Sequence, residues 1–200
     1  MNGSEKTIYG ESYDKLKAVM DRLTESITEA AERITEKTGM EPIEHLKYRI
    51  KSDESMREKC RRKGLPETED SALHKVHDAI GLRVVCTFLD DVYAIRDCIK
   101  SLEGIEVFRE KDYIRNVKPN GYRSYHMIVM LGGFFAEIQI RTISMDTWAA
   151  LEHHMRYKKN IGGNTALIFE ELKRCADELA ATDASMLTIR NMINEEDGRQ

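Results

Sequence analysis

Residues 124–142 read SYHMIVMLGGFFAEIQIRT, and this stretch decides the class of fold. Its second half, residues 134–141, alternates polar and apolar side chains with the period of two that is typical of a β-strand. The first half, residues 124–131, is a second strand candidate, and Gly132-Gly133 between them is a two-residue hairpin signal. The sequence therefore predicts an antiparallel hairpin within a sheet.

A turn of just these two glycines fixes how the two strands pair. The predicted cross-strand pairs are Ile128 with Glu137, His126 with Gln139, and Ser124 with Arg141. One face of the hairpin then carries an imidazole, a carboxylate, an amide and a guanidinium. An ordinary solvated sheet face explains their polarity. It does not explain why four such groups converge beside the loop that precedes the hairpin.

That loop, residues 118–123, reads KPNGYR. Proline fixes its own φ, and asparagine and glycine accept the positive φ that closes a tight turn. Lys118 and Arg123 place on either side of the turn a charge that is suited to phosphate, and Tyr122 offers a flat face on which a nucleobase can stack. The alternative is a hairpin turn with solvated charges.

Residues 52–64, SDESMREKCRRKG, predict a short helix with Ser52 or Asp53 as its N-cap and Gly64 as its end. Spacings of three and four residues put polar groups on one face. The groups on this face or leading to it are Arg49, Lys51, Ser55, Lys59 and Arg62. Together they could hold a triphosphate. A basic, solvated helix face is the alternative.

Asp78 stands immediately before an apolar, β-branched stretch, residues 79–88, that predicts a central strand. An acidic residue at a strand edge is where a phosphoryl-transfer site would hold a divalent metal. Because Mg²⁺ takes one or two protein carboxylates in addition to substrate phosphates and water, Asp78 and Glu137 would be a sufficient protein contribution.

The order of these motifs resembles the synthetase domain of RelA/SpoT enzymes. The match spans residues 42–159, and the length of the chain is similar to that of the stand-alone small alarmone synthetases. The motifs that carry the resemblance are Arg49-x-Lys51, Ser55, Lys59, Asp78, Arg83, residues 113–126, residues 137–142, and Trp148-Ala149 followed by Glu152-His153 and Tyr157-Lys158.

The resemblance implies a GTP or GDP pyrophosphokinase of the stringent response. Such an enzyme transfers the β,γ-pyrophosphate of ATP to the ribose 3′-hydroxyl of a guanine nucleotide, which makes (p)ppGpp and AMP. The resemblance also implies Mg²⁺ as the cofactor and a homotetramer as the assembly.

Roles for single residues follow from the same resemblance. The expected ATP-binding residues are Arg49, Lys51, Ser55, Lys59, Arg62 and Arg83, with the adenine between Arg49 and Arg83. The expected guanine-nucleotide-binding residues are Lys118, Asn120, Tyr122, His126, Gln139 and Arg141, with Tyr122 stacked on guanine. Asp78 and Glu137 are the expected metal ligands and catalytic residues, and Glu137 is the candidate base.

The whole pattern predicts a single α+β domain over residues 1–200, with a mixed sheet flanked by helices, and the resemblance implies that this domain is of nucleotidyltransferase-like type. Residues 11–38 predict a long amphipathic N-terminal helix, residues 42–159 the core, and residues 165–193 the C-terminal helices. These terminal helices offer more apolar surface than one modest sheet can cover, which favours a homo-oligomer.

Composition indicates which kinds of partner to expect. Of the 200 residues, 41% are hydrophobic and 33% are charged, enough for one substantial core. A net charge of −4 argues against DNA as a partner and makes RNA an unexpected one. With no long apolar run, no signal-peptide pattern and four irregularly spaced cysteines, we expect a cytoplasmic protein without membrane contact, disulfides or zinc.

Two other classes of function remain open from the sequence. One is a catalytically degenerate nucleotide sensor, although the presence of both Asp78 and Glu137 counts against it. The other is an RNA-binding regulatory module that uses the basic helix and Tyr122. The choice among GMP, GDP and GTP as acceptor is also open, because these nucleotides differ only in phosphates that flexible lysine and arginine side chains can accommodate.

Overall fold

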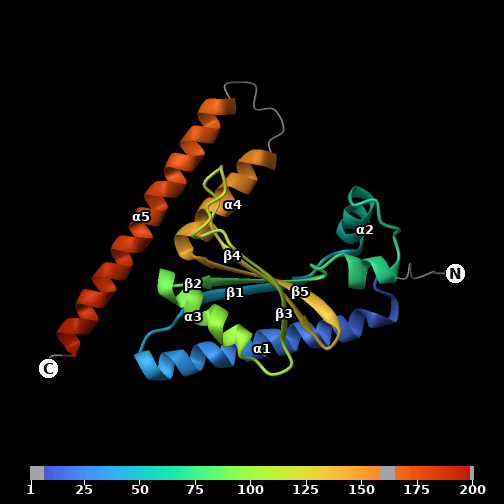
Figure 1. The fold of residues 1–200 in the computed structure, drawn as a ribbon, viewed down its shortest axis with the longest axis horizontal. Coiled ribbons are helices and arrows are strands. Elements are labelled where there is room, and N and C mark those ends of the chain that lie inside the picture. The colour runs from blue at the N-terminus through green and yellow to red at the C-terminus, as the bar shows by residue number, and fades with distance from the viewer. Residues whose placement is uncertain (1–6, 158–164, 199–200) are drawn as a thin grey trace.

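The computed structural model describes residues 7–157 and 165–198, which form a five-stranded mixed sheet with helices on both sides (Figure 1). The strands are β1 (Ile43–Ile50), β2 (Ile80–Cys86), β3 (Glu106–Asp112), β4 (Tyr125–Leu131) and β5 (Phe134–Thr142), in the spatial order β1-β2-β5-β4-β3. β2 and β5 pair in parallel, and the other neighbours pair antiparallel. The predicted α+β class with a mixed sheet is confirmed.

The long helices are α1 (Tyr13–Thr38), α2 (Asp53–Arg62), α3 (Leu89–Lys100), α4 (Ile143–Tyr157) and α5 (Thr165–Asp197). Two short turns, η1 (Gly10–Ser12) and η2 (Ser71–Lys75), complete the described elements. In Figure 1, α1 and α3 lie below the sheet, whereas α2 and α4 stand above opposite ends of it. α5 is one continuous helix where the sequence predicted several. No helix of the described residues is long and apolar enough to cross a membrane.

The hairpin has the predicted register. Ile128 pairs with Glu137 and His126 with Gln139, across a turn in which Gly132 and Gly133 have φ of 58° and 85°. Only glycine takes such angles at little cost, so the two glycines determine where the strands reverse. The remaining predicted pair lies just outside β4, where the Oγ atom of Ser124 accepts a hydrogen bond from Nε of Arg141 at 3.3 Å.

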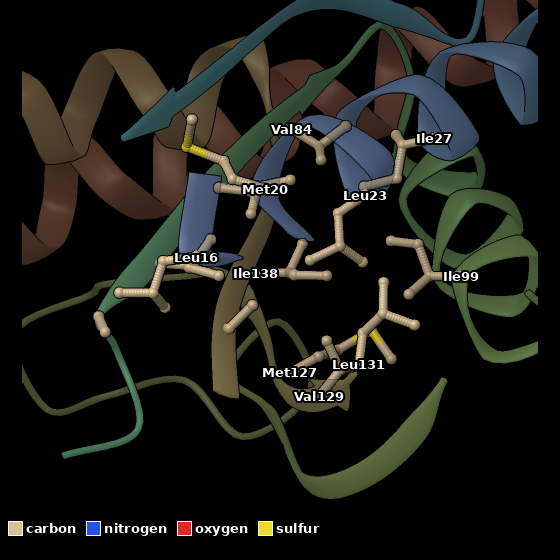
Figure 2. Packing of buried hydrophobic residues seen from close by; sticks show 14 of the residues in the cluster. Leu16, Met20, Leu23, Ile27, Val84, Ile99, Met127, Val129, Leu131 and Ile138 are labelled. Carbon is tan, nitrogen blue, oxygen red and sulfur yellow. The ribbon is translucent and has the colours of Figure 1, made fainter. Parts of the chain in front are cut away.

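The core lies between the sheet and the helices α1 and α3 (Figure 2). Its labelled members are Leu16, Met20, Leu23, Ile27, Val84, Ile99, Met127, Val129, Leu131 and Ile138. Burying one such side chain stabilises the fold by roughly 1.5–3 kcal/mol. Because side chains of a strand alternate between faces, burial of Ile138 sends Glu137 and Gln139 to the opposite face of the sheet.

Helix α2 begins and ends where the sequence predicts. Of the two N-cap candidates the structure uses Ser52, whose side chain accepts a hydrogen bond from the backbone N–H of Ser55, and Gly64 follows the helix with φ of 68°. Met56 and Cys60 are buried on the inner face of α2. The polar face of α2 therefore stays available to a ligand.

The loop 118–123 is docked on α5 by a close backbone approach. Gly121 has φ of 90°, and a Cβ atom there would lie 2.7 Å from Cβ of Ala176, so no larger residue fits. Arg123 donates to the backbone oxygen of Ala176 at 3.2 Å and to Asp177 at 2.8 Å. In this structure the guanidinium of Arg123, which was predicted to supply charge for a phosphate, is used to hold α5. The four cysteines are free thiols.

Candidate active site

The face of the sheet opposite α1 and α3 carries a cleft of about 600 Å³. Six of the predicted site residues line it, namely Arg49, Arg83, Tyr122, Glu137, Gln139 and Arg141. Helix α4 contributes the other wall through residues that include Glu152 and His153. The volume is within the usual range of about 300–1,000 Å³ for small-molecule sites.

Strand register explains why these side chains share one face. Arg49 on β1 pairs with Gly81 on β2, which pairs in turn with Glu137 on β5. Two residues further along the same strands, Arg83 on β2 pairs with Gln139 on β5. Because Gly81 has no side chain, the floor of the cleft between Arg49 and Glu137 is flat and open to a ligand.

Asp78 gathers two of the predicted phosphate-binding lysines. Its Oδ2 atom lies 3.0 Å from Nζ of Lys51 and also accepts a hydrogen bond from Lys59 on α2. Burial by itself would raise the pKa of Asp78, but Lys59 and Lys51 outweigh it and lower that pKa. The carboxylate is therefore ionised at neutral pH. Its second oxygen, Oδ1, is buried and has no hydrogen-bond partner among the residues that the structure describes.

Asp78 and Glu137 belong to neighbouring segments of the sheet. Asp78 lies in the turn that leads into β2, three residues before the Gly81 that pairs with Glu137. Lys51, directly after β1, continues the alternation of Lys47 and Arg49, which places its side chain on the cleft face. The bond from Lys51 to Asp78 thus ties the acid to the same side of the sheet as Glu137.

Glu137 is half-buried between an amide and an imidazole. Its Oε2 atom accepts a hydrogen bond from Nε2 of Gln139 at 3.2 Å, and its Oε1 atom lies 3.9 Å from Nδ1 of His126. Burial, reinforced by Arg141 and Lys118, lowers the pKa of His126 to about 3. The imidazole is therefore neutral at physiological pH, and its contact with Glu137 is not an ion pair.

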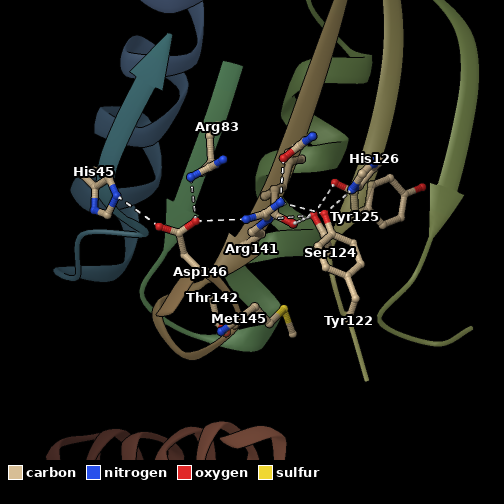
Figure 3. A network of polar contacts seen from close by, with 12 residues as sticks. His45, Arg83, Tyr122, Ser124, Tyr125, His126, Arg141, Thr142, Met145 and Asp146 are labelled. Carbon is tan, nitrogen blue, oxygen red and sulfur yellow. Dashed lines mark hydrogen bonds and ion pairs between the residues drawn. The ribbon is translucent and has the colours of Figure 1, made fainter. Parts of the chain in front are cut away.

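The Tyr122 hydroxyl contacts two other residues that are expected to bind the guanine nucleotide, Arg141 and His126. It accepts a hydrogen bond from Nη2 of Arg141 at 2.7 Å and lies 2.8 Å from Nε2 of His126 (Figure 3). Because the hydroxyl already accepts from Arg141, it donates its one proton to Nε2 of His126. We therefore assign the neutral His126 tautomer with its proton on Nδ1, on the side toward Glu137. The sequence predicted a role for the ring alone, and the structure adds one for the hydroxyl.

The Lys118 ammonium packs against the rings of Tyr113 and Tyr122. It lies 4.6 Å from the ring centre of Tyr122 and 4.3 Å from that of Tyr113. The predicted tight turn is present, since the backbone N–H of Gly121 donates to the oxygen of Lys118 at 2.8 Å. A cation and a flat ring are thus presented together.

Two residues that are expected to bind the guanine nucleotide, Arg141 and Asn120, use their polar groups in contacts within the protein. Arg141 is 4% exposed, and its guanidinium donates to Ser124, Asp146, Tyr122 and Gln139. Asparagine 120 uses its Oδ1 atom to accept from the backbone N–H of Tyr122 at 3.2 Å, a contact that shapes the loop. In this structure both residues therefore support the part of the site that is expected to bind the guanine nucleotide.

A family model described as a region found in RelA / SpoT proteins matches residues 48–162, more than half of the chain. The chain belongs to the RelA/SpoT family. The matched region contains β2 to β5, α2, α3 and almost all of the cleft lining.

Several relatives of this RelA/SpoT-family chain span most of its length. GTP pyrophosphokinase YwaC of Bacillus subtilis (strain 168) is 40% identical over 164 residues, 78% of each chain. GTP pyrophosphokinase YjbM of the same strain is 34% identical over 162 residues, 77% of this chain and 75% of that protein.

Solved structures of relatives have the same fold. Small alarmone synthetase 2 from Bacillus subtilis matches with a TM-score of 0.77 and 37% identity over 88% of this chain and 96% of its own. Small alarmone synthetase 1 from Bacillus subtilis, bound to its product pppGpp, matches with a TM-score of 0.75 and 29% identity over 89% and 94%. The long terminal helices of the RelA/SpoT-family chain are thus part of a known arrangement.

Eight of the predicted site residues of the RelA/SpoT-family chain lie outside the cleft lining, namely Lys51, Ser55, Lys59, Arg62, Asp78, Lys118, Asn120 and His126. Ser55 and Arg62 are exposed on α2, and the Oγ atom of Ser55 lies 2.9 Å from that of Ser52, within hydrogen-bond distance. In Figure 1, α2 stands above the opposite end of the sheet from α4, and Lys59 on α2 forms an ion pair with Asp78 in the turn before β2. Lys158, the last residue of the predicted motifs, is outside the described residues.

The family chain also carries a residue that the sequence did not predict. Asp146, in the first turn of α4, is 8% exposed and forms ion pairs with Arg83 at 3.3 Å and Arg141 at 3.1 Å. His45 on β1 faces its other oxygen at 3.9 Å. The available signal was an acidic residue one helical turn after the Arg-Thr that ends the strand motif, which is weak because acids are common in first turns.

Proposed function

We propose that this RelA/SpoT-family chain is a GTP pyrophosphokinase, an ATP:GTP 3′-diphosphotransferase that makes (p)ppGpp and AMP. The observation that carries the proposal is the cleft, in which arginines suited to a nucleobase stand across a flat floor from a tyrosine ring and a carboxylate. Relatives of similar length are named GTP pyrophosphokinase. Since its substrates are nucleotides of the cytoplasm, we expect the enzyme to act there.

The reaction forms a bond between the acceptor 3′-oxygen and the β-phosphorus of ATP. The bond from that phosphorus to the oxygen bridging to the α-phosphorus breaks, and AMP leaves with the bridging oxygen. A ribose hydroxyl is a weak nucleophile, so its proton needs an acceptor. Glu137 is the proposed base, because it lies on the cleft face with one oxygen held by Gln139.

On the donor side, the adenine of ATP is proposed to lie between Arg49 and Arg83, both in the cleft lining. Lys51 and Lys59 then turn from Asp78 to the phosphates, and Ser55 and Arg62 extend this set along α2. Asp78 thus keeps two cations in place until a triphosphate competes for them. Positioning and charge neutralisation of this kind supply most of the acceleration in phosphoryl transfer.

Magnesium fits the acids that the chain provides. The ionised Asp78 has one buried oxygen without a hydrogen-bond partner among the described residues, which suits a metal ligand, and Glu137 is the second proposed ligand. Mg²⁺ needs only one or two protein carboxylates when phosphates and water supply the rest. When bound, the ion would neutralise charge on the transferred pyrophosphate.

On the acceptor side, guanine is proposed to stack on Tyr122, with Lys118 beside the ring for an acceptor phosphate. The neutral His126 presents its Nδ1 side to Glu137 at 3.9 Å and adds no charge there. Arg141 and Asn120 hold Tyr122 in place through hydrogen bonds to its hydroxyl and to its backbone N–H, respectively.

An assay of AMP release from ATP with GMP, GDP or GTP tests the proposal. We expect release that depends on the guanine nucleotide. Nucleotide binding without AMP release would instead identify a degenerate sensor. Salt-dependent RNA affinity without ATP consumption would identify an RNA-binding module.

Replacing Tyr122 separates the roles of its ring and its hydroxyl. Tyr122→Ala should weaken acceptor binding by about 5- to 150-fold, because stacking on one base contributes about 1–3 kcal/mol. Tyr122→Phe keeps the ring but removes the contacts to Arg141 and His126, and a net hydrogen bond of about 0.5–1.5 kcal/mol predicts a smaller loss of about 2- to 12-fold. Calorimetric titration with GDP measures both. Equal losses in the two variants would refute a role for stacking.

We also propose that copies of the chain cover the apolar surface of α4 and α5, and that the assembly is a homotetramer. The exposed apolar residues there are Ile143, Leu151, Met155, Leu167, Phe169, Met186, Ile189, Met192 and Ile193. Exposed apolar side chains that gather on a surface mark an interaction site. Positions 186, 189 and 193 follow helical spacing and form one stripe.

Light scattering should therefore give four times the mass of one chain at micromolar concentration. The double variant Met186→Glu with Ile189→Glu should reduce that mass, since it places charge in the stripe. Thr188→Glu, on another side of the helix, should leave the mass unchanged. A monomeric wild-type protein would rule out the assembly.

A further inference from the structure

Asp146 connects three strands of the sheet through one carboxylate (Figure 3). Its Oδ1 atom accepts from Nη1 of Arg141 on β5 at 3.1 Å and lies 3.3 Å from Nη1 of Arg83 on β2. Its Oδ2 atom faces Nε2 of His45 on β1 at 3.9 Å, a nitrogen that is buried and has no hydrogen-bond partner within the described part of the chain. The two arginines therefore share a single oxygen.

The position of Asp146 is fixed by the start of α4. The Thr142 hydroxyl accepts a hydrogen bond from the backbone N–H of Met145 at 3.2 Å, which caps the helix immediately after β5. The positive end of the helix dipole stabilises an acid in this first turn. Asp146 is thus held rigidly, while Arg83, with 39% of its side chain exposed, can move into the cleft.

The two arginines belong to the proposed binding sites of different nucleotides. Arg83 borders the part of the cleft assigned to adenine. Arg141 is buried and donates both to the Tyr122 hydroxyl and to Oε1 of Gln139, each at 2.7 Å, and Gln139 in turn holds Glu137. Asp146 is consequently the contact at which the donor side and the acceptor side of the cleft meet.

We propose that Asp146 is a positioning residue that couples the binding of the two nucleotides. This inference rests on the proposed function, because it uses the assignment of Arg83 to ATP and of Tyr122 to the acceptor. When adenine draws Arg83 away from Oδ1, the carboxylate is left to Arg141 alone. Arg141 then holds Tyr122 and Gln139 more firmly, which prepares the acceptor side.

The coupling is positive and reciprocal, as linkage requires. A bound ATP molecule raises the affinity for the guanine nucleotide by the same factor by which the guanine nucleotide raises the affinity for ATP. Couplings between protein sites are typically about 5- to 150-fold. We expect this one to be at least about 5-fold, since a single charged contact carries it.

Calorimetric titration measures this factor directly. The probe is an ATP analogue with a methylene group between the α- and β-phosphorus, which cannot react, titrated with and without saturating GDP. The wild-type protein should bind the analogue at least about 5-fold more tightly in the presence of GDP. In Asp146→Asn the two affinities should agree within about 2-fold, and Asp146→Glu, which keeps the charge, should recover part of the difference.

Two further variants make the result decisive. Asp146→Asn leaves Arg141 as a buried charge without its counter-ion, and if that variant does not fold, Arg83→Gln removes the donor-side contact instead and should also abolish the coupling. Asp90→Asn, which loses an exposed ion pair with Arg190 on α5, should keep the wild-type factor.

The outcomes separate this inference from the proposed function. Wild-type coupling that persists in a folded Asp146→Asn or Arg83→Gln protein, or its absence from an active wild-type enzyme, would overturn the role of Asp146 alone. A wild-type protein that releases no AMP from ATP and GDP would overturn the proposed function as well.

Discussion

Glu137→Gln should lower kcat by about 10²- to 10⁴-fold, the usual loss when a general base is removed. The amide has the shape of the carboxylate but cannot take the proton of the 3′-hydroxyl. Because the base acts mainly in the transition state, the KM for ATP and the KM for GDP should change far less than kcat. Initial rates of AMP formation at varied concentrations of each nucleotide measure these constants.

Glu106→Gln is a matched control for this substitution. Glu106 is an exposed carboxylate on β3 of the same sheet and does not line the cleft. Its variant should keep the wild-type rate. Near-normal turnover of Glu137→Gln would mean that another group takes the proton, and the mechanism given for Glu137 would be wrong.

Asp78→Asn should lower the rate by roughly 10²-fold or more and should also raise the Mg²⁺ concentration needed for half-maximal activity. A bound metal stabilises developing charge by several kcal/mol, and the variant loses a proposed ligand of that metal. It also releases Lys51 and Lys59 from the carboxylate that holds them. Magnesium titrations of the initial rate check both effects.

Asp97→Asn provides the control, because Asp97 on α3 has 63% of its side chain exposed and pairs only with its neighbour Arg96 among the described ion pairs. If Asp78→Asn slows the reaction but leaves the magnesium response unchanged, Asp78 serves only to position the lysines. The proposed metal site would then have to be abandoned.

The sheet side of the site could be predicted because strand geometry depends on local rules. The Gly132-Gly133 turn and the alternation along β5 were sufficient to give the pairs of Glu137 and Gln139 with their partners on β4. The same alternation put Glu137 and Gln139 on the face away from the core. A period of two leaves only two faces to choose between.

What side chains do within the site could not be predicted in the same way. Arg123 and Arg141 are both cations beside a phosphate-type motif, yet Arg123 binds α5 and Arg141 is buried in a network around Tyr122. Which partner a flexible guanidinium takes depends on tertiary packing, here on the placement of α4 and α5. Asp146 was missed for the same reason. Arg141 is near it in the sequence, but its other ion-pair partner, Arg83, comes from a strand that is distant in the sequence.

The most direct test of the central claim compares GDP with 3′-deoxy-GDP as acceptors for ATP. If the chain transfers pyrophosphate to the ribose 3′-hydroxyl, GDP should give AMP and ppGpp in equal amounts, and 3′-deoxy-GDP should give neither. Phosphorus NMR of the products identifies the diphosphate on the 3′-oxygen. AMP released at the same rate with both acceptors, or with neither GDP nor any other guanine nucleotide, would contradict the account.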